Sequence, residues 1–231
     1  MTRALVWLSR LFGALLLGFI ALQLWFLGHI LYYKYYPPAE TSFMRYRLEE
    51  LRARNPRAAL AYKWVPYDRI SRKLKSALIA AEDAKFVEHE GFDWDGIQVA
   101  LEKNRRRGKT VAGGSTISQQ LAKNLFLSPS RNWFRKGEEA LITLMLEATL
   151  DKERILELYL NVIEWGNDVF GAEAAAQKYF GVPAAQLSAE QSARLAAMAP
   201  NPRFYERNPG APGLARKIGI IHERMASAEL P

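Results

Sequence analysis

Apolar residues are distributed unevenly along the chain, and the longest apolar run lies near the N-terminus. Residues 11–33 carry no formal charge, and Gln23 and His29 are their only strongly polar members. A helix of this length, at roughly 1.5 Å per residue, crosses the roughly 30 Å hydrocarbon layer of a membrane. The run exceeds the core of a signal peptide, no small-x-small cleavage site follows it, and Pro37 and Pro38 end it. The sequence therefore predicts an uncleaved transmembrane anchor over residues 11–33.

From about residue 40 onward, apolar positions recur at helical spacing, and no alternating strand pattern is convincing. We expect helices at residues 70–81, 139–150, 151–161 and 172–180, one capped by Asp93, and one that follows a capping box of Ser188 and Gln191. Residues 139–150 are apolar almost all round, which predicts a helix buried inside the domain. The part of the chain beyond the anchor is therefore expected to be essentially all-helical.

Charge and cysteine content narrow the classes of function. The chain has 32 Lys and Arg against 24 Asp and Glu, a net charge of +8, and residues 1–39 hold three basic and no acidic residues. The modest excess beyond residue 39 fits an anionic partner such as a phosphate, a lipid headgroup or a nucleic acid, or simply a solvated basic surface. Cysteine is absent, which excludes disulfide scaffolds, thiol catalysis and cysteine metal sites.

Two adjacent acids, Glu82 and Asp83, follow the apolar face of the predicted helix 70–81. A carboxylate at the edge of an apolar layer is partly desolvated, which raises its pKa and suits it to general acid or base catalysis. The alternative is that both are ordinary exposed acids at a helix end.

A glycine-containing loop precedes the next helix, for which Ser115 or Thr116 is the expected cap. Free N–H groups at a helix start attract phosphates, and Gln119 and Lys123 share the polar face opposite the apolar stripe. This face suits a phosphorylated sugar, although a solvated helix face has the same pattern. The stretch lacks the G-x-x-x-x-G-K-[ST] spacing, which disfavours nucleotide hydrolysis.

A basic cluster lies at the start of the apolar helix that follows. Arg135 and Glu139 are four residues apart, so Glu139 is expected to face the interior with a cation beside it. Arg131, Arg135 and Lys136 together supply donors that suit a diphosphate. A simple salt bridge at the helix start is the alternative.

The order of these motifs is more specific than any one of them. EDAKFVEHEGFD, GGSTISQQLAKN, RKGEE and ILELYLNVIEWG closely resemble the successive motifs of the peptidoglycan glycosyltransferases, glycosyltransferase family 51, over about residues 65–205. The resemblance implies a lysozyme-like helical domain. With the anchor, it divides the chain into a cytoplasmic N-terminus (1–10), the anchor (11–33), a linker (34–60) and a glycosyltransferase domain (61–231). No S-x-x-K motif is present, so we expect no transpeptidase domain.

The resemblance also implies a reaction, the polymerisation of lipid II with inversion at the sugar and release of undecaprenyl diphosphate. It makes Glu82 the general base for the acceptor's GlcNAc 4-hydroxyl. It places Glu139, the second catalytic candidate, near the donor's diphosphate, where it holds a divalent metal (Mg²⁺ or Mn²⁺) or orients the basic residues. The residues expected to bind substrate are Ser115, Gln119, Gln120, Lys123, Arg131, Arg135 and Lys136.

The expected partners are lipid II, the growing glycan chain, the bilayer and other cell-wall synthesis or division proteins. The family works at the bacterial inner membrane, so the resemblance places the catalytic domain on the outer, periplasmic face. Trp133 and Phe134 flank the basic cluster and suit membrane contact, with core packing as the alternative. A lysozyme-like hydrolase is one rival, but it has no use for cations around a diphosphate. A nucleic-acid or anionic-lipid binder using residues 103–109 is the other; this run lacks interleaved aromatics, so no nucleic acid is expected.

Overall fold

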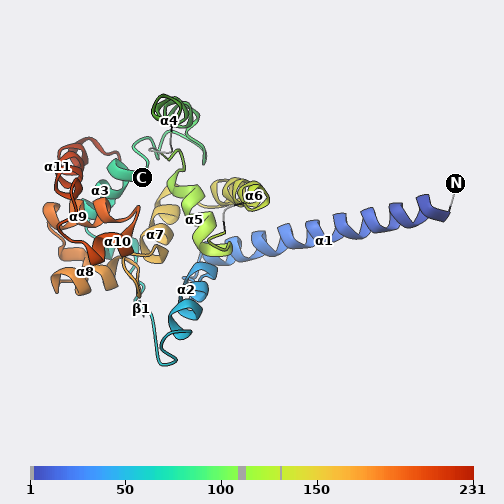
Figure 1. The fold of residues 1–231 in the computed structure, drawn as a ribbon, viewed down its shortest axis with the longest axis horizontal. Helices are drawn as coiled ribbons and strands as arrows, with labels where there is room; N and C mark the ends of the chain where they lie inside the picture. The colour runs from blue at the N-terminus through green and yellow to red at the C-terminus, as the bar shows by residue number, and fades with distance from the viewer. Residues whose placement is uncertain (1–2, 109–112, 131) are drawn as a thin grey trace. The chain divides into compact units, whose positions relative to one another are not determined.

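The computed structural model of the chain describes residues 3–108, 113–130 and 132–231. Helices make up most of it, which confirms the predicted all-α class (Figure 1). The chain forms two compact units, Met1–Tyr36 and Pro37–Pro231.

The first unit is a single helix, α1 (Arg3–Tyr33), of 31 residues. Its length and composition are sufficient to cross a membrane, and none of its most apolar window is buried in protein. The helix also includes residues 3–10, which precede the predicted anchor 11–33, because nothing in residues 3–10 breaks a helix.

The second unit holds the remaining elements. Its helices are α2 (Ser42–Arg52), α3 (Arg72–Glu82), α4 (Trp94–Arg107), α5 (Ile117–Phe126), α6 (Trp133–Thr149), α7 (Lys152–Val162), α8 (Ala172–Phe180), α9 (Ala189–Met198), α10 (Pro202–Arg207) and α11 (Leu214–Arg224). Short 3₁₀ helices lie at η1 (Tyr67–Arg69), η2 (Ala184–Gln186) and η3 (Met225–Ser227). Strand structure in the described ranges is limited to β1 (Ala61–Tyr62) and β2 (Val169–Phe170), which pair in parallel with Ala61 opposite Val169.

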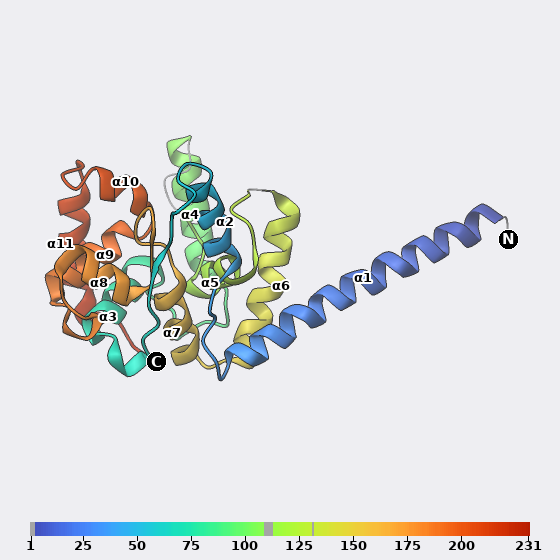
Figure 2. The ribbon, with the colours of Figure 1, turned by 90° about the horizontal axis from the view of Figure 1, so that it is seen from below.

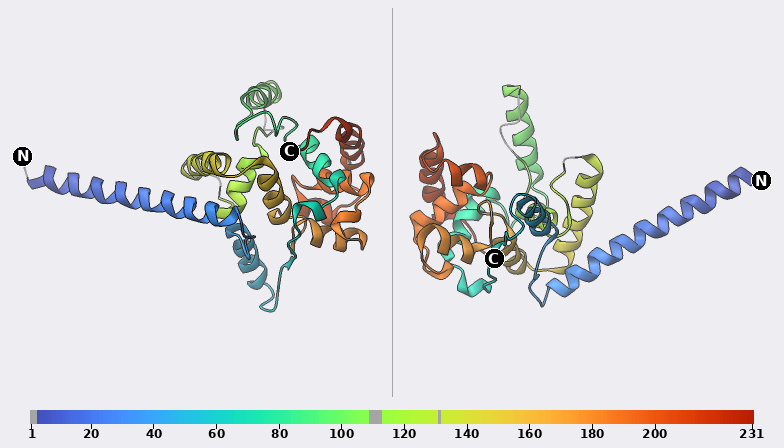
Figure 3. Two further views of the ribbon diagram at one scale, coloured as in Figure 1. Left: turned by 180° about the vertical axis from the view of Figure 1, so that it is seen from behind. Right: turned by 60° about the horizontal axis from the view of Figure 1, so that its bottom comes forward.

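The helices of this unit form two groups with α7 between them (Figures 2 and 3). In one group α9 packs against α3 and α11; in the other α5 packs against α6 and α2, and it also packs against α7. The core consists of fully buried side chains such as Leu78, Leu121, Leu158, Leu195 and Trp165. Burying one large apolar side chain contributes about 1.5–3 kcal/mol to the stability of the fold. This core therefore fixes the positions of α3, α5 and α6 relative to one another.

Local signals placed several helix ends correctly. Asp93 accepts a hydrogen bond from the Gly96 N–H at the start of α4, and Ser188 and Gln191 form the predicted capping box of α9. Such caps depend on residues only three positions apart, so the sequence is sufficient to predict them.

Two expectations differ from the structure. Within the predicted linker 34–60, α2 packs against α5 and buries Phe43 and Met44, so this segment belongs to the folded unit. Helix α6 is not buried all round, because only one of its faces meets α5 and α7; Leu141 and Leu144 on its outer side are 38% and 52% exposed. An apolar sequence does not by itself supply a partner for every face of a helix.

Candidate active site

The first site residue, Glu82, is the last residue of α3. Ser71 caps the start of this helix, and Leu78 and Ile79 anchor its inner face in the core. The Glu82 Oε2 accepts a hydrogen bond of 2.8 Å from the Gln120 side chain. Burial raises the pKa of Glu82, and the Gln120 hydrogen bond and the positive charge of Lys123 offset only part of this effect. A carboxylate in this state accepts a proton more readily than an exposed glutamate.

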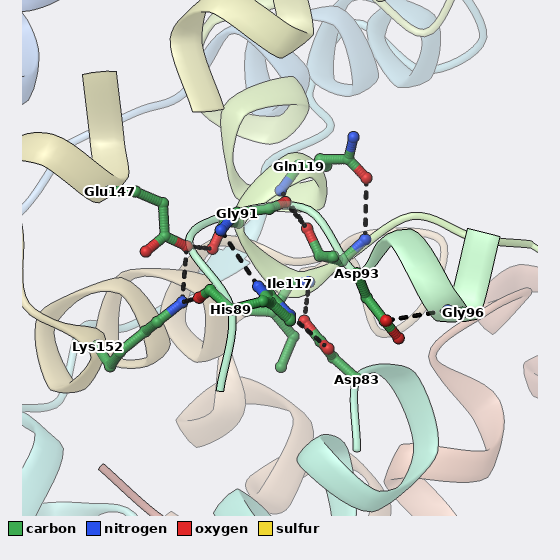
Figure 4. Close-up of polar contacts among 11 residues, drawn as sticks. Asp83, His89, Gly91, Asp93, Gly96, Ile117, Gln119, Glu147 and Lys152 are labelled. Carbon is green, nitrogen blue, oxygen red and sulfur yellow. Dashed lines mark hydrogen bonds and ion pairs between the residues drawn. The ribbon is translucent and has the colours of Figure 1, made fainter. Parts of the chain in front are cut away.

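The neighbouring acid, Asp83, has a different environment. It is buried, and its two oxygens accept hydrogen bonds of 2.9 Å from the Ile117 N–H and from His89 Nε2 (Figure 4). The Gly91 N–H donates to His89 Nδ1, so the ring proton lies on Nε2 and is donated to Asp83. Asp83 is therefore occupied in joining the loop after α3 to the first residue of α5.

A capping box built from Thr116 and Gln119 begins α5. Thr116 Oγ1 accepts from the Gln119 N–H, and Gln119 Oε1 accepts from the Thr116 N–H at 3.1 Å. The same Thr116 hydroxyl donates to the Gly91 carbonyl at 2.7 Å, which adds a second link between the loop and α5. Of the two candidate caps, Thr116 thus does the capping, and the Ser115 hydroxyl accepts a hydrogen bond from Lys136.

Gln120 occupies the centre of the site. Its amide nitrogen donates to Glu82, and its Oε1 accepts a 3.0 Å hydrogen bond from the Tyr159 hydroxyl on α7. Burial raises the pKa of Tyr159 well above its usual value, so this hydroxyl keeps its proton and remains a donor. Tyr159 therefore orients the Gln120 amide so that its N–H side faces the carboxylate.

The basic cluster surrounds Glu139, which is buried on α6. Arg135 Nη1 donates to Glu139 Oε2 at 2.6 Å, and Lys136 Nζ donates to Oε1. One turn from the end of α5, Lys123 is largely enclosed, and burial lowers its pKa although the negative charge of Glu139 opposes this. Lys123, Arg135 and Lys136 thus surround a single bonded carboxylate, that of Glu139, which leaves this part of the cavity positive.

These groups line one cavity of about 390 Å³. It is lined by six of the predicted binding residues and by the catalytic candidate Glu139; the six are Ser115, Gln119, Gln120, Lys123, Arg135 and Lys136. Glu82 reaches the cavity through its hydrogen bond to Gln120. Arg131, also predicted to bind phosphate, lies outside the described residues.

Several lining residues were not predicted. These are Arg47 from α2, Tyr159 from α7, Glu164 after α7, and Asn201 and Arg203 near α10. Arg47 Nη2 donates a hydrogen bond of 3.3 Å to Glu164 Oε2, 117 positions away in sequence. Tyr159 and Glu164 lie inside the motif ILELYLNVIEWG, so the family resemblance could have pointed to them. Nothing in the local sequence pattern marks Arg47 as a site residue.

A metal site at Glu139 is poorly supported by the chemistry of the donors. Both of its oxygens already accept charged hydrogen bonds from Arg135 and Lys136. Among the residues that the structure describes, no three His, Asp or Glu side chains gather as metal ligands do. The residues present do not fit a protein-held divalent cation, and no chemical step is assigned to one.

Comparisons with known proteins identify the family of the chain. Residues 49–226 match the family model described as Transglycosylase. A protein of Chromobacterium violaceum is 61% identical over 97% of this chain and 98% of its own length, and one of Dechloromonas aromatica is 61% identical over 97% of each. A third, from Aromatoleum aromaticum, is 55% identical over the whole of both chains. All three carry the name biosynthetic peptidoglycan transglycosylase. This chain belongs to the transglycosylase family.

Proposed function

We propose that this protein is a peptidoglycan glycosyltransferase that polymerises lipid II. The observation that carries the proposal is that Gln120, which lines the cavity beside the cations of α5 and α6, donates a hydrogen bond to Glu82, a carboxylate of raised pKa. A base beside an anion-binding region suits the transfer of a sugar from a diphosphate to a hydroxyl group. The names of the relatives point to the same substrate class.

In the proposed reaction Glu82 accepts the proton of the acceptor's GlcNAc 4-hydroxyl as the new bond forms. The acceptor oxygen attacks the anomeric carbon of the donor's terminal MurNAc, and the bond from that carbon to the diphosphate oxygen breaks. The configuration inverts, and the bonding electrons leave with undecaprenyl diphosphate. A sugar hydroxyl is a very weak acid, so the proton transfer accompanies the attack rather than preceding it.

The leaving diphosphate gains negative charge, and Lys123, Arg135 and Lys136 are the cations that would receive it. Glu139 holds Arg135 and Lys136 in place through its two oxygens before the substrate arrives. Because these groups are fixed in advance, little reorganisation is needed as the charge develops. We therefore assign Glu139 the role of orienting the cations.

The membrane placement follows from α1 and from two aromatic side chains at the start of α6. Trp133 and Phe134 are 91% and 93% exposed, directly before Arg135. Aromatic groups beside cations suit the headgroup region of a bilayer, where the lipid part of the substrate lies. We propose a single-pass protein of the inner membrane with its catalytic domain on the outer face.

Labelling tests this orientation. The chain has no cysteine, so Ser227→Cys in η3 supplies a single thiol. Intact spheroplasts treated with a membrane-impermeant maleimide should label at this position, and a cysteine replacing Ser9 in α1 should label only after lysis. The reverse pattern would place the domain in the cytosol and defeat the proposal.

The activity is tested with Glu82→Gln in the detergent-solubilised full chain. This variant keeps the shape of the side chain but removes the base, and such catalysis is typically worth about 10²–10⁴-fold. Lipid II should still bind but no longer polymerise. Glu90→Gln is the matched control, because Glu90 is exposed on the same loop. A Glu82→Gln rate above about a tenth of the unmodified rate would refute the base assignment, and release of fragments from sacculi would indicate a hydrolase instead.

A further inference from the structure

One partly exposed ammonium group outside the cavity, that of Lys152, joins several parts of the site. Lys152 is the first residue of α7, and its side chain is 20% exposed. Its Nζ donates to the His89 carbonyl at 2.5 Å and to Glu147 Oε1 at 2.8 Å. It also lies 4.6 Å from the centroid of the Phe86 ring, within range of a cation–π interaction. Lys152 thus contacts the loop after Glu82 at two positions, Phe86 and His89.

The partner of this lysine, Glu147, reaches the other side of the site. Glu147 lies near the end of α6 with 8% of its side chain exposed, and its Oε1 also accepts a hydrogen bond from Ser118 in the first turn of α5 (Figure 4). Gly91 lies against the same carboxylate, since a Cβ there would be 3.1 Å from Glu147 Cγ. The Lys152–Glu147 pair therefore joins the loop, α5, α6 and α7.

The Lys152–Glu147 pair is bonded to both parts of the proposed active site, the loop beside Glu82 and the helix α5. Through the His89 carbonyl, Lys152 holds the loop whose His89 ring in turn holds Asp83, the neighbour of Glu82. Through Glu147 and Ser118 it holds the helix that carries Gln120 and Lys123. Lys152 and Glu147 use their charged groups on each other, and neither they nor Ser118 line the cavity, so we assign them no contact with the substrate.

We infer that Lys152 is a positioning residue that sets the distance and orientation of Glu82 relative to α5. The inference rests on the proposed role of Glu82 as the base. A buried charge is stable only when it is paired, so loss of the ammonium leaves the Glu147 carboxylate without its charged partner and releases the His89 carbonyl. The loop and α5 are then free to move apart by fractions of an ångström, which is sufficient to slow a reaction that depends on close alignment.

The test is Lys152→Met in the solubilised full chain, measured by initial rates of lipid II polymerisation. We expect kcat to fall by about ten-fold or more and KM to change by less than about two-fold, because the substrate contacts remain. The matched control is Lys75→Met. Lys75 is a buried lysine, donates to the Tyr67 carbonyl at 3.2 Å and lies 3.6 Å from the centroid of the Tyr67 ring, outside the cavity. Its replacement should lower stability but leave kcat unchanged.

A double variant separates positioning from a general loss of structure. If Lys152 acts through Glu82, then adding Lys152→Met to Glu82→Gln should lower the residual rate by less than about two-fold. An equal loss in both backgrounds would overturn the inference, and so would an unchanged kcat in Lys152→Met. If Lys152→Met fails to fold, Ser118→Ala replaces it, because this variant removes only the hydrogen bond from Ser118 to Glu147. It should lower kcat by about three-fold or more and leave KM unchanged. An unchanged kcat in Ser118→Ala would also overturn the inference.

The Glu82→Gln variant tests the proposed function independently of Lys152. If Glu82→Gln keeps its activity, the proposed function fails whatever Lys152→Met does. If Glu82→Gln is inactive and Lys152→Met is fully active, the base assignment stands and only the positioning role is lost.

Discussion

The hydrogen bond from Gln120 to Glu82 predicts how the enzyme should depend on pH. At 2.8 Å it favours the charged form of Glu82, whereas burial favours the neutral form and raises the pKa. Gln120→Met removes the donor and keeps a side chain of similar length. The pKa of Glu82 should therefore rise further, and the acidic limb of the rate profile should move to higher pH.

The size of this shift follows from the strength of the bond. A hydrogen bond to a charged group contributes about 1.5–3 kcal/mol, and about 1.4 kcal/mol corresponds to one pKa unit. The acidic limb should thus move up by about one to two pH units. Below the new pKa the rate should fall about ten-fold for each pH unit, because the base is lost to protonation.

The assay is the initial rate of lipid II polymerisation from pH 5 to 9, at saturating and at limiting substrate. Tyr159→Phe is an independent test, because it removes the 3.0 Å hydrogen bond that orients the Gln120 amide. The limb should move in the same direction by about one unit or less, as expected for a bond between neutral groups. Gln98→Met, at an exposed glutamine of α4, is the control and should leave the limb unmoved. A fall in the Gln120→Met rate that is equal at every pH would show that the hydrogen bond does not set the pKa of Glu82.

Three further predictions concern the cations and the loop. Lys123→Ala should raise the barrier by about 2–5 kcal/mol if the ammonium meets a desolvated phosphate, measured as kcat/KM; a near-normal value would support a solvated helix face. Glu139→Gln should reduce activity severely by releasing Arg135 and Lys136, and recovery on titration with Mg²⁺ would contradict the orienting role. Gly91→Ala should lower the free energy of unfolding by about 2–4 kcal/mol in a denaturant titration, since Gly91 has φ +88° and a Cβ would lie 2.7 Å from Thr143 Cγ2; a loss under about 0.5 kcal/mol would show that the loop moves aside.

Interactions between residues close in sequence made much of the fold predictable. The 3.6-residue period marks a helix whatever its surroundings, and the caps at Asp93 and at Ser188 with Gln191 depend on residues three positions away. The pairing of Arg135 with Glu139 belongs to the same class, because neighbours four apart on a helix meet. The motifs EDAKFVEHEGFD and GGSTISQQLAKN identified the family, since the motifs and their order are visible in the sequence itself.

Contacts between distant segments were decided only by the tertiary structure. Glu82 and Asp83 are adjacent acids, yet one faces Gln120 and the other is held by His89 and the Ile117 N–H. The local pattern did not separate them and only the family resemblance singled out Glu82, because the contacts with Gln120 and Ile117 come from α5, more than thirty positions away.

The same reason explains the other differences from expectation. Helix α2 is part of the domain because it packs against α5 and its Phe43 and Met44 are buried. One face of α6 stays exposed because no element of its unit covers it in the described residues. Burial depends on which surfaces meet, and the periodicity of one segment carries no information about its partner. The sequence alone determined which residues form helices and which motifs carry chemistry; packing decided which of those residues meet.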